Sequence, residues 1–156
     1  MNGFMFDTNI FNSILDKKIE IGQQFENFNY YITHIQFCEL NATPIEDRKN
    51  ELLKVVEQIK NKEILTESGT VGVSKVGRCK VNDVSLYSKL LSKLQELDKS
   101  SGKNKNWKNQ ARDVLIAETC IKNNLILVTN DGNLRKVMIE FNGHTKNLDD
   151  FLTSNS

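Results

Sequence analysis

Residues 3–9 read Gly3-Phe4-Met5-Phe6-Asp7-Thr8-Asn9, an apolar run that ends at a carboxylate. An uninterrupted apolar run of this length is typical of a short strand that is buried on both faces, as in a parallel sheet. Thr8 then fits the N-cap of a helix that we expect over residues 9–16. This arrangement places Asp7 at the carboxyl end of a buried strand, where open α/β sheets bind their ligands.

Similar units recur along the chain. We expect a polar connection over residues 19–29, a loop or small hairpin over the Gly-rich residues 67–80, and a short terminal turn over residues 148–152. Strands that alternate with helices predict an α/β fold, with a central parallel sheet flanked by helices in three layers, as one domain over residues 1–156. The expected further strands are 30–32 and 125–129, and the expected helices are 34–41 (capped by Thr33), 45–62, 83–97, 107–123 and one that begins near residue 131.

The composition excludes several classes of protein. Twenty-one basic and 20 acidic residues give a formal net charge of +1, so any contact with nucleic acid must come from local patches. Three widely spaced cysteines form no disulfide framework, which indicates a reducing, cytoplasmic setting. No stretch approaches the roughly 20 apolar residues of a membrane span, so we expect no membrane partner.

Four acidic residues occupy positions where a carboxylate is costly. Asp7 and Asp131 each follow a predicted strand, and Glu39 and Asp113 fall on the apolar sides of predicted helices. Carboxylates that meet in a partly buried site repel one another unless a cation compensates their charge. A site built only from carboxylate oxygens favours hard cations, so we expect Mg²⁺ or Mn²⁺.

Each acid has a plainer interpretation when it is taken alone. Asp7 could cap a helix, and Asp131 with Gly132 could form an ordinary turn. Glu39 could extend to solvent from a helix edge, and Asp113 could be favoured by the dipole of the helix that carries it. The prediction of a metal site therefore depends on all four acids together.

In order and spacing, four short motifs resemble those of PIN-domain nucleases, and the end of the chain resembles the VapC-type toxin branch. The motifs are Phe6-Asp7-Thr8-Asn9, Cys38-Glu39-Leu40, Arg112-Asp113-Val114-Leu115-Ile116-Ala117 and Val128-Thr129-Asn130-Asp131, and the ending is Asn147-Leu148-Asp149-Asp150-Phe151-Leu152.

The resemblance implies a metal-dependent endoribonuclease that is the toxin of a toxin–antitoxin pair. It assigns Asp7, Glu39, Asp113 and Asp131 as the catalytic, metal-binding acids, with Thr8, Asn9 and Thr129 orienting them. It further implies an RNA substrate, a small antitoxin protein that covers the acidic crevice, and a homodimer. One departure is the sequence Gly132-Asn133-Leu134, where many relatives carry a further acid and an aromatic residue, so the number of metals stays open.

Other functions remain alternatives. A PIN-like module could bind RNA or a protein without cutting, and a structure-specific DNA nuclease could use a similar acid cluster. A zinc site is disfavoured because only His34 and Cys38 among the possible ligands lie close in sequence. Metal-dependent cleavage that is lost in variants of the acids would separate a nuclease from a binding module.

Basic residues gather before and within the helix that bears Asp113. Cations there could contact phosphates, and Trp107 could stack on an unpaired base. The alternatives are a solvated linker for the lysines and a core position for Trp107. The predicted RNA-binding residues are Lys103, Lys105, Lys108, Arg112 and Arg135.

Overall fold

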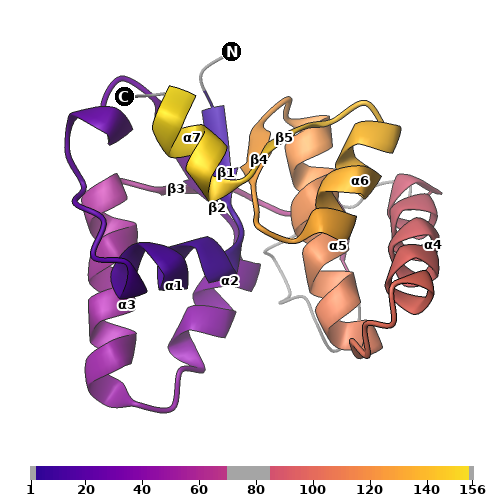
Figure 1. Cartoon of the computed structure of the whole chain (residues 1–156), viewed down its shortest axis with the longest axis horizontal. Coiled ribbons are helices and arrows are strands. Elements are labelled where there is room, and N and C mark those ends of the chain that lie inside the picture. The colour runs from indigo at the N-terminus through magenta and orange to yellow at the C-terminus, as the bar shows by residue number, and fades with distance from the viewer. Residues whose placement is uncertain (1–2, 70–84, 155–156) are drawn as a thin grey trace.

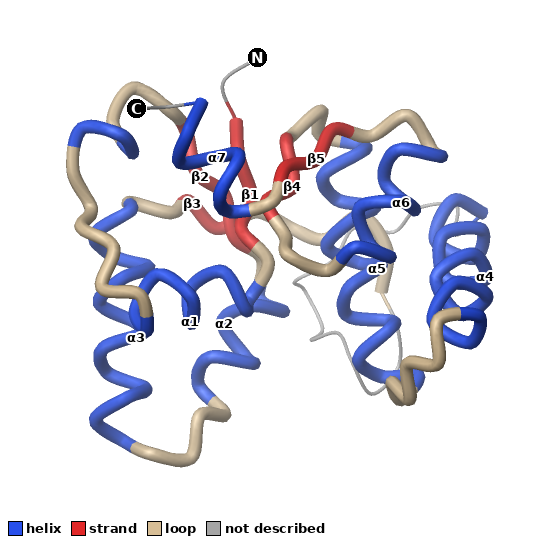
Figure 2. The backbone as a smooth tube through the Cα atoms, in the orientation of Figure 1, coloured by secondary structure: helices blue, strands red, loops and turns tan. Residues whose placement is uncertain are grey.

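The computed structural model describes residues 3–69 and 85–154. Within them a five-stranded parallel sheet has the order β3-β2-β1-β4-β5, and helices cover both of its faces (Figures 1 and 2). The α/β architecture predicted from the sequence is therefore confirmed. The strands are β1 (Gly3–Phe6), β2 (Asn29–Ile32), β3 (Lys62–Glu63), β4 (Ile126–Val128) and β5 (His144–Lys146).

The helices follow the expected positions closely. Thr33 caps the second helix through its hydroxyl, as predicted. A 3-10 turn, η1 (Gln23–Phe25), interrupts the segment that we expected to be only a polar connection. The helices are α1 (Thr8–Asp16), α2 (His34–Asn41), α3 (Glu46–Ile59), α4 (Ser85–Ser100), α5 (Trp107–Lys122), α6 (Gly132–Glu140) and α7 (Leu148–Ser154).

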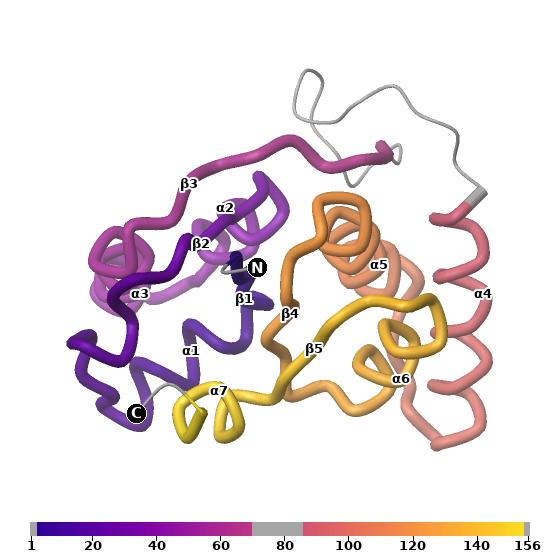
Figure 3. Tube along the Cα trace, turned by 90° about the horizontal axis from the view of Figure 1, so that it is seen from above, coloured from indigo at the N-terminus to yellow at the C-terminus, as the bar shows by residue number. Residues whose placement is uncertain are grey.

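Two apolar cores lie on the two faces of the sheet. Phe4 and Phe6 of β1 face α1, α3 and α7, whereas Met5 between them faces α4, α5 and α6. The strand is thus buried on both sides, as its unbroken apolar run indicates. Figure 3 shows the two groups of helices on opposite sides of β1 and β4.

Several predicted boundaries differ from the structure. The helix expected to reach Lys62 ends at Ile59, because Lys60 adopts a left-handed conformation and the chain turns into β3. The expected terminal turn is the helix α7, which continues to Ser154. Residues 70–80 of the predicted Gly-rich loop lie outside the described ranges, so that prediction stays untested. Nowhere in those ranges does a helix combine the length and apolar character that a bilayer crossing requires.

Candidate functional site

The strand order creates a topological switch point at the carboxyl ends of the central strands. β1 lies between β2 and β4, so the chain leaves the carboxyl ends of β1 and β4 toward opposite faces. Such a switch point is where parallel sheets open to ligands. Asp7 directly follows β1, and its backbone N–H donates to the Val128 carbonyl of β4 at 3.0 Å. Asp131 lies three residues beyond Val128, so both acids emerge at this switch point.

Asp7 is buried, and both of its carboxylate oxygens have partners. Oδ1 accepts from the Thr8 backbone N–H at 2.8 Å, and Oδ2 accepts from the Thr129 hydroxyl at 2.9 Å. Asp7, rather than the predicted Thr8, is therefore the N-cap of α1. The Thr129 hydroxyl therefore holds the Asp7 carboxylate in one orientation.

Glu39 enters the site from α2. The Thr8 hydroxyl donates to Glu39 Oε1 at 3.0 Å. Because Thr8 directly follows Asp7, this hydrogen bond brings Glu39 to the turn that carries Asp7. Glu39 also lines a pocket of about 300 Å³ with Arg112. Because its carboxylate is partly buried and hydrogen-bonded, the interpretation as a glutamate extended to solvent is wrong. Asn9 is exposed, and its side chain makes no hydrogen bond to an acid in the described part of the chain.

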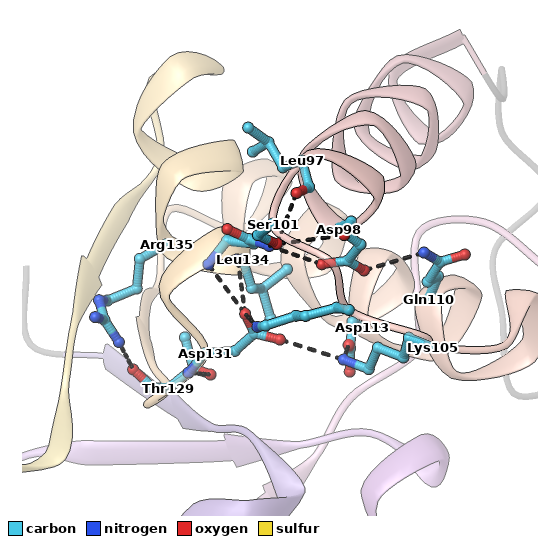
Figure 4. A network of polar contacts seen from close by, with 12 residues as sticks. Leu97, Asp98, Ser101, Lys105, Gln110, Asp113, Thr129, Asp131, Leu134 and Arg135 are labelled. Atoms are coloured by element: carbon cyan, nitrogen blue, oxygen red, sulfur yellow. Dashed lines mark hydrogen bonds and ion pairs between the residues drawn. The ribbon is translucent and has the colours of Figure 1, made fainter.

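Asp113 of α5 and Asp131 before α6 share a lysine (Figure 4). Lys105 Nζ donates to Asp113 Oδ2 and, at 3.2 Å, to Asp131 Oδ2. Asp131 Oδ1 caps α6 through the N–H groups of Asn133 and Leu134, and it also accepts from Lys103 Nζ at 3.0 Å. The ammonium groups of Lys103 and Lys105 thus both contact this pair of carboxylates.

Burial and neighbouring charges shift the pKa values of the four acids. Burial raises the pKa of Asp113 to about 8, and the negative charge of Asp7 acts in the same direction. Burial also raises the pKa of Asp7 and of Glu39. Asp131 differs: although burial works against ionisation, hydrogen bonds from Lys103 and the Leu134 N–H hold its pKa below the usual value. Three of the four carboxyls thus hold their protons more readily than usual, and a bound cation would favour their ionised forms.

The other basic residues that we predicted to bind RNA do not contact the acids directly in the described part of the chain. Arg112 donates to Asn109 Oδ1 at 2.8 Å, and Arg135 donates to the Thr129 carbonyl at 2.8 Å. Lys108 is exposed. Trp107 is 49% exposed, so the core interpretation of this residue is wrong.

A buried polar network next to the acids was absent from the sequence-based prediction. Asp98 of α4 is only 1% exposed, and it accepts from Gln110 Nε2 at 3.0 Å and from Asn133 Nδ2 at 2.9 Å. Asn133 Nδ2 also donates to the Ser101 hydroxyl at 2.9 Å. Asp98 lies four and eight residues after the buried Leu94 and Leu90. The rule that identified Asp113, an acid on an apolar helix face, would find Asp98 only if the helix predicted over residues 83–97 were extended by one residue, as α4 in the structure is.

The donor chemistry of the acids fits a hard divalent cation, since every candidate ligand is a carboxylate oxygen. An ammonium group already lies between Asp113 and Asp131, which shows that this position attracts positive charge. With the side chains as they stand, no three His, Cys, Asp or Glu residues in the described ranges are arranged to hold one ion. A metal would therefore need these side chains to move, and a metal held by Asp113 and Asp131 would also need Lys105, which pairs with both, to withdraw.

Comparisons with known proteins support the fold. No family model and no curated protein sequence matches the chain. A chain in the crystal structure of VapBC2 from Rickettsia felis, bound to a DNA fragment from their promoter, has a TM-score of 0.56 at 17% identity. The match covers 94% of this chain and 99% of that one. A chain in the structure of VapBC-1 from nontypeable Haemophilus influenzae has a TM-score of 0.50 at 14% identity, covering 93% and 97%. These likenesses confirm the PIN-like fold that the sequence motifs imply.

Proposed function

We propose that this protein is a divalent-metal-dependent endoribonuclease and the toxin of a toxin–antitoxin pair. The observation that supports the proposal is the set of contacts around the switch point of the sheet. Thr129 holds Asp7, Thr8 holds Glu39, and Lys105 joins Asp113 to Asp131. Capping alone does not explain this arrangement, because Glu39 and Asp113 begin no helix.

The four acids would hold Mg²⁺ or Mn²⁺. When bound, such an ion supplies a nucleophile from water at neutral pH and stabilises the charge on the leaving oxygen. The chain's own part is to orient the ligands: Thr129 fixes Asp7, and Thr8 fixes Glu39. Hydrogen bonds of this kind keep ligating oxygens in place and commonly influence metal affinity by about 10–100-fold.

RNA would approach across the start of α5. Lys108 and Trp107 are exposed there, and Arg112 lines the pocket beside Glu39. A half-exposed indole suits stacking on an unpaired base, and nearby cations suit phosphates. These features favour a single-stranded or looped RNA over a duplex.

An antitoxin partner is part of the proposal. Both similar structures described above are VapBC structures, and the VapC-type ending of this chain supports a partner that covers the four acids. A homodimer is proposed from the family resemblance alone.

The test is cleavage of a panel of tRNA, single-stranded RNA and single-stranded DNA in Mg²⁺ or Mn²⁺, with EDTA as the metal-free arm. The variants Asp7→Asn and Asp113→Asn should lose about 100-fold or more in rate, because a lost ligand costs at least as much as a lost supporting hydrogen bond. Asp149→Asn is the matched control, since this exposed residue of α7 undergoes the same change in charge.

The outcomes separate the competing functions. Metal-dependent RNA cleavage that both site variants lose supports the proposal. Cleavage of DNA in preference to RNA would indicate a DNA nuclease. Equal inactivity of folded wild type and variants across the panel would favour a binding module.

A further inference from the structure

We propose that Lys105 is the resident counter-ion of the acidic site and competes with the divalent metal for Asp113 and Asp131. This inference rests on the proposed function. It gives Lys105 a role different from the one expected from the sequence, where it was one of several lysines facing RNA.

The contacts of Lys105 set it apart from the other cations nearby. Its ammonium group pairs with both Asp113 and Asp131, whereas Lys103 pairs with Asp131. The Lys105 side chain is 28% exposed, and those of its two partners are 14% and 15% exposed. Ion pairs that are this far withdrawn from water are screened less by salt than surface pairs are.

The reach of the Lys105 charge supports the same role. Its positive charge acts on all four acids, including Asp7 and Glu39, which it does not touch. A divalent ion at the same place would have the same task of balancing four carboxylates. The Lys105 ammonium group and a metal ion cannot both lie between Asp113 Oδ2 and Asp131 Oδ2.

The connection that carries Lys105 is anchored at both ends. Before it, the Lys103 N–H donates to the Asp98 carbonyl at 2.9 Å, and the Ser101 N–H donates to the Leu97 carbonyl at 3.0 Å. After it, Asn106 caps α5 through the Asn109 N–H. Because lysine has a long flexible stem, the ammonium can leave the carboxylates by side-chain rotation while the connection stays in place.

Competition of this kind reduces the apparent affinity for metal. If the ammonium occupies the site in about nine of ten molecules, the apparent Kd is about tenfold weaker than the intrinsic value. Removing the ammonium group should therefore strengthen the apparent affinity for metal by about tenfold. Replacing it by another cationic group should leave the affinity unchanged.

The experiment is calorimetric titration of metal-free protein with Mn²⁺. Lys105→Ala should bind about tenfold more tightly than wild type, and Lys105→Arg should bind as wild type does. Lys108→Ala removes an exposed charge three residues away without vacating the position between Asp113 and Asp131, so its affinity should stay within about threefold, because exposed charges are largely screened. Without metal, Lys105→Ala should also melt about 4 °C lower, because it leaves the acids unbalanced.

Each other outcome overturns the inference. If Lys105→Ala is folded and binds Mn²⁺ no more tightly than wild type, Lys105 does not compete with the metal, while the proposed nuclease stands. If Lys108→Ala gains as much Mn²⁺ affinity as Lys105→Ala, the gain comes from the change in net charge and not from the position of Lys105. If neither wild type nor Lys105→Ala binds Mn²⁺ at millimolar concentration, the metal site and the proposed function fail together.

Discussion

At the scale of single residues, Asp7 and Asp131 each use the two oxygens of one carboxylate for two tasks. One oxygen caps a helix, and the other lies toward a partner at the switch point. The capping interpretation of Asp7 and the metal-ligand interpretation are therefore compatible. The same duality makes Asp→Asn a clean test, because asparagine caps helices about as well as aspartate while it removes the charge.

Asp113 should make the metal-free protein less stable as the pH rises. Its pKa is about 8 in the folded protein, against an ordinary value of 3.8. Between these values the folded state holds a proton that the unfolded state has lost, so the free energy of unfolding falls with increasing pH. Asp113→Asn cannot ionise. From pH 5 to pH 8, wild type should therefore lose at least about 1.4 kcal/mol more than this variant, the equivalent of one pKa unit.

Urea denaturation in EDTA at several pH values measures this difference. The slope against pH is the quantity to compare, because Asp113→Asn also alters the contact with Lys105. Asp149→Asn should follow the wild-type pH dependence. Parallel curves for wild type and Asp113→Asn would contradict the assigned environment of Asp113.

At the scale of elements, Asp98 joins the three helices on one face of the sheet. Its carboxylate accepts from Gln110 of α5 and Asn133 of α6, and it lies on α4 itself. An aspartate at position 133 would place a second carboxylate against Asp98 and would have no amide to donate. An asparagine at this position thus suits its partner on α4.

Asp98→Ala should lower the free energy of unfolding by about 2–4 kcal/mol, since it removes a buried acceptor that Gln110 and Asn133 share. Asp98→Asn should cost less, because its side-chain oxygen can still accept. Glu57→Ala, at an exposed position of α3, should stay within about 0.5 kcal/mol. Urea unfolding measures all three. If Asp98→Ala is no more harmful than Glu57→Ala, the network does not hold these helices together.

The elements that could be predicted are those with a strong apolar pattern. β1 and β4 have unbroken apolar runs, and α5 has a wide apolar face, so their positions were clear. β3 and β5 were missed because they are short and polar, and each joins the sheet by backbone pairing to one neighbour. Such edge strands carry no hydrophobic periodicity for a sequence-based prediction to detect.

At the scale of the whole molecule, the fold brings together residues that are more than 100 positions apart. The Thr129 hydroxyl reaches Asp7 across 122 residues, and Thr8 reaches Glu39 across 31. The order of strands explains this proximity, because β1 lies between β2 and β4. The burial or partial burial of the four acids was predictable from their positions in the sequence, whereas their role as a site stays a prediction. The placement of Lys105 among them was not predictable, because its backbone lies in a polar connection whose side-chain directions no pattern encodes.

Mn²⁺ binding, measured by electron paramagnetic resonance, shows whether these four acids form one cation site. Wild type should bind at least one Mn²⁺, and Asp7→Asn, Glu39→Gln, Asp113→Asn and Asp131→Asn should each bind about tenfold or more weakly. Asp149→Asn should bind as wild type does. If the four site variants retain wild-type affinity, the acids do not form a metal site.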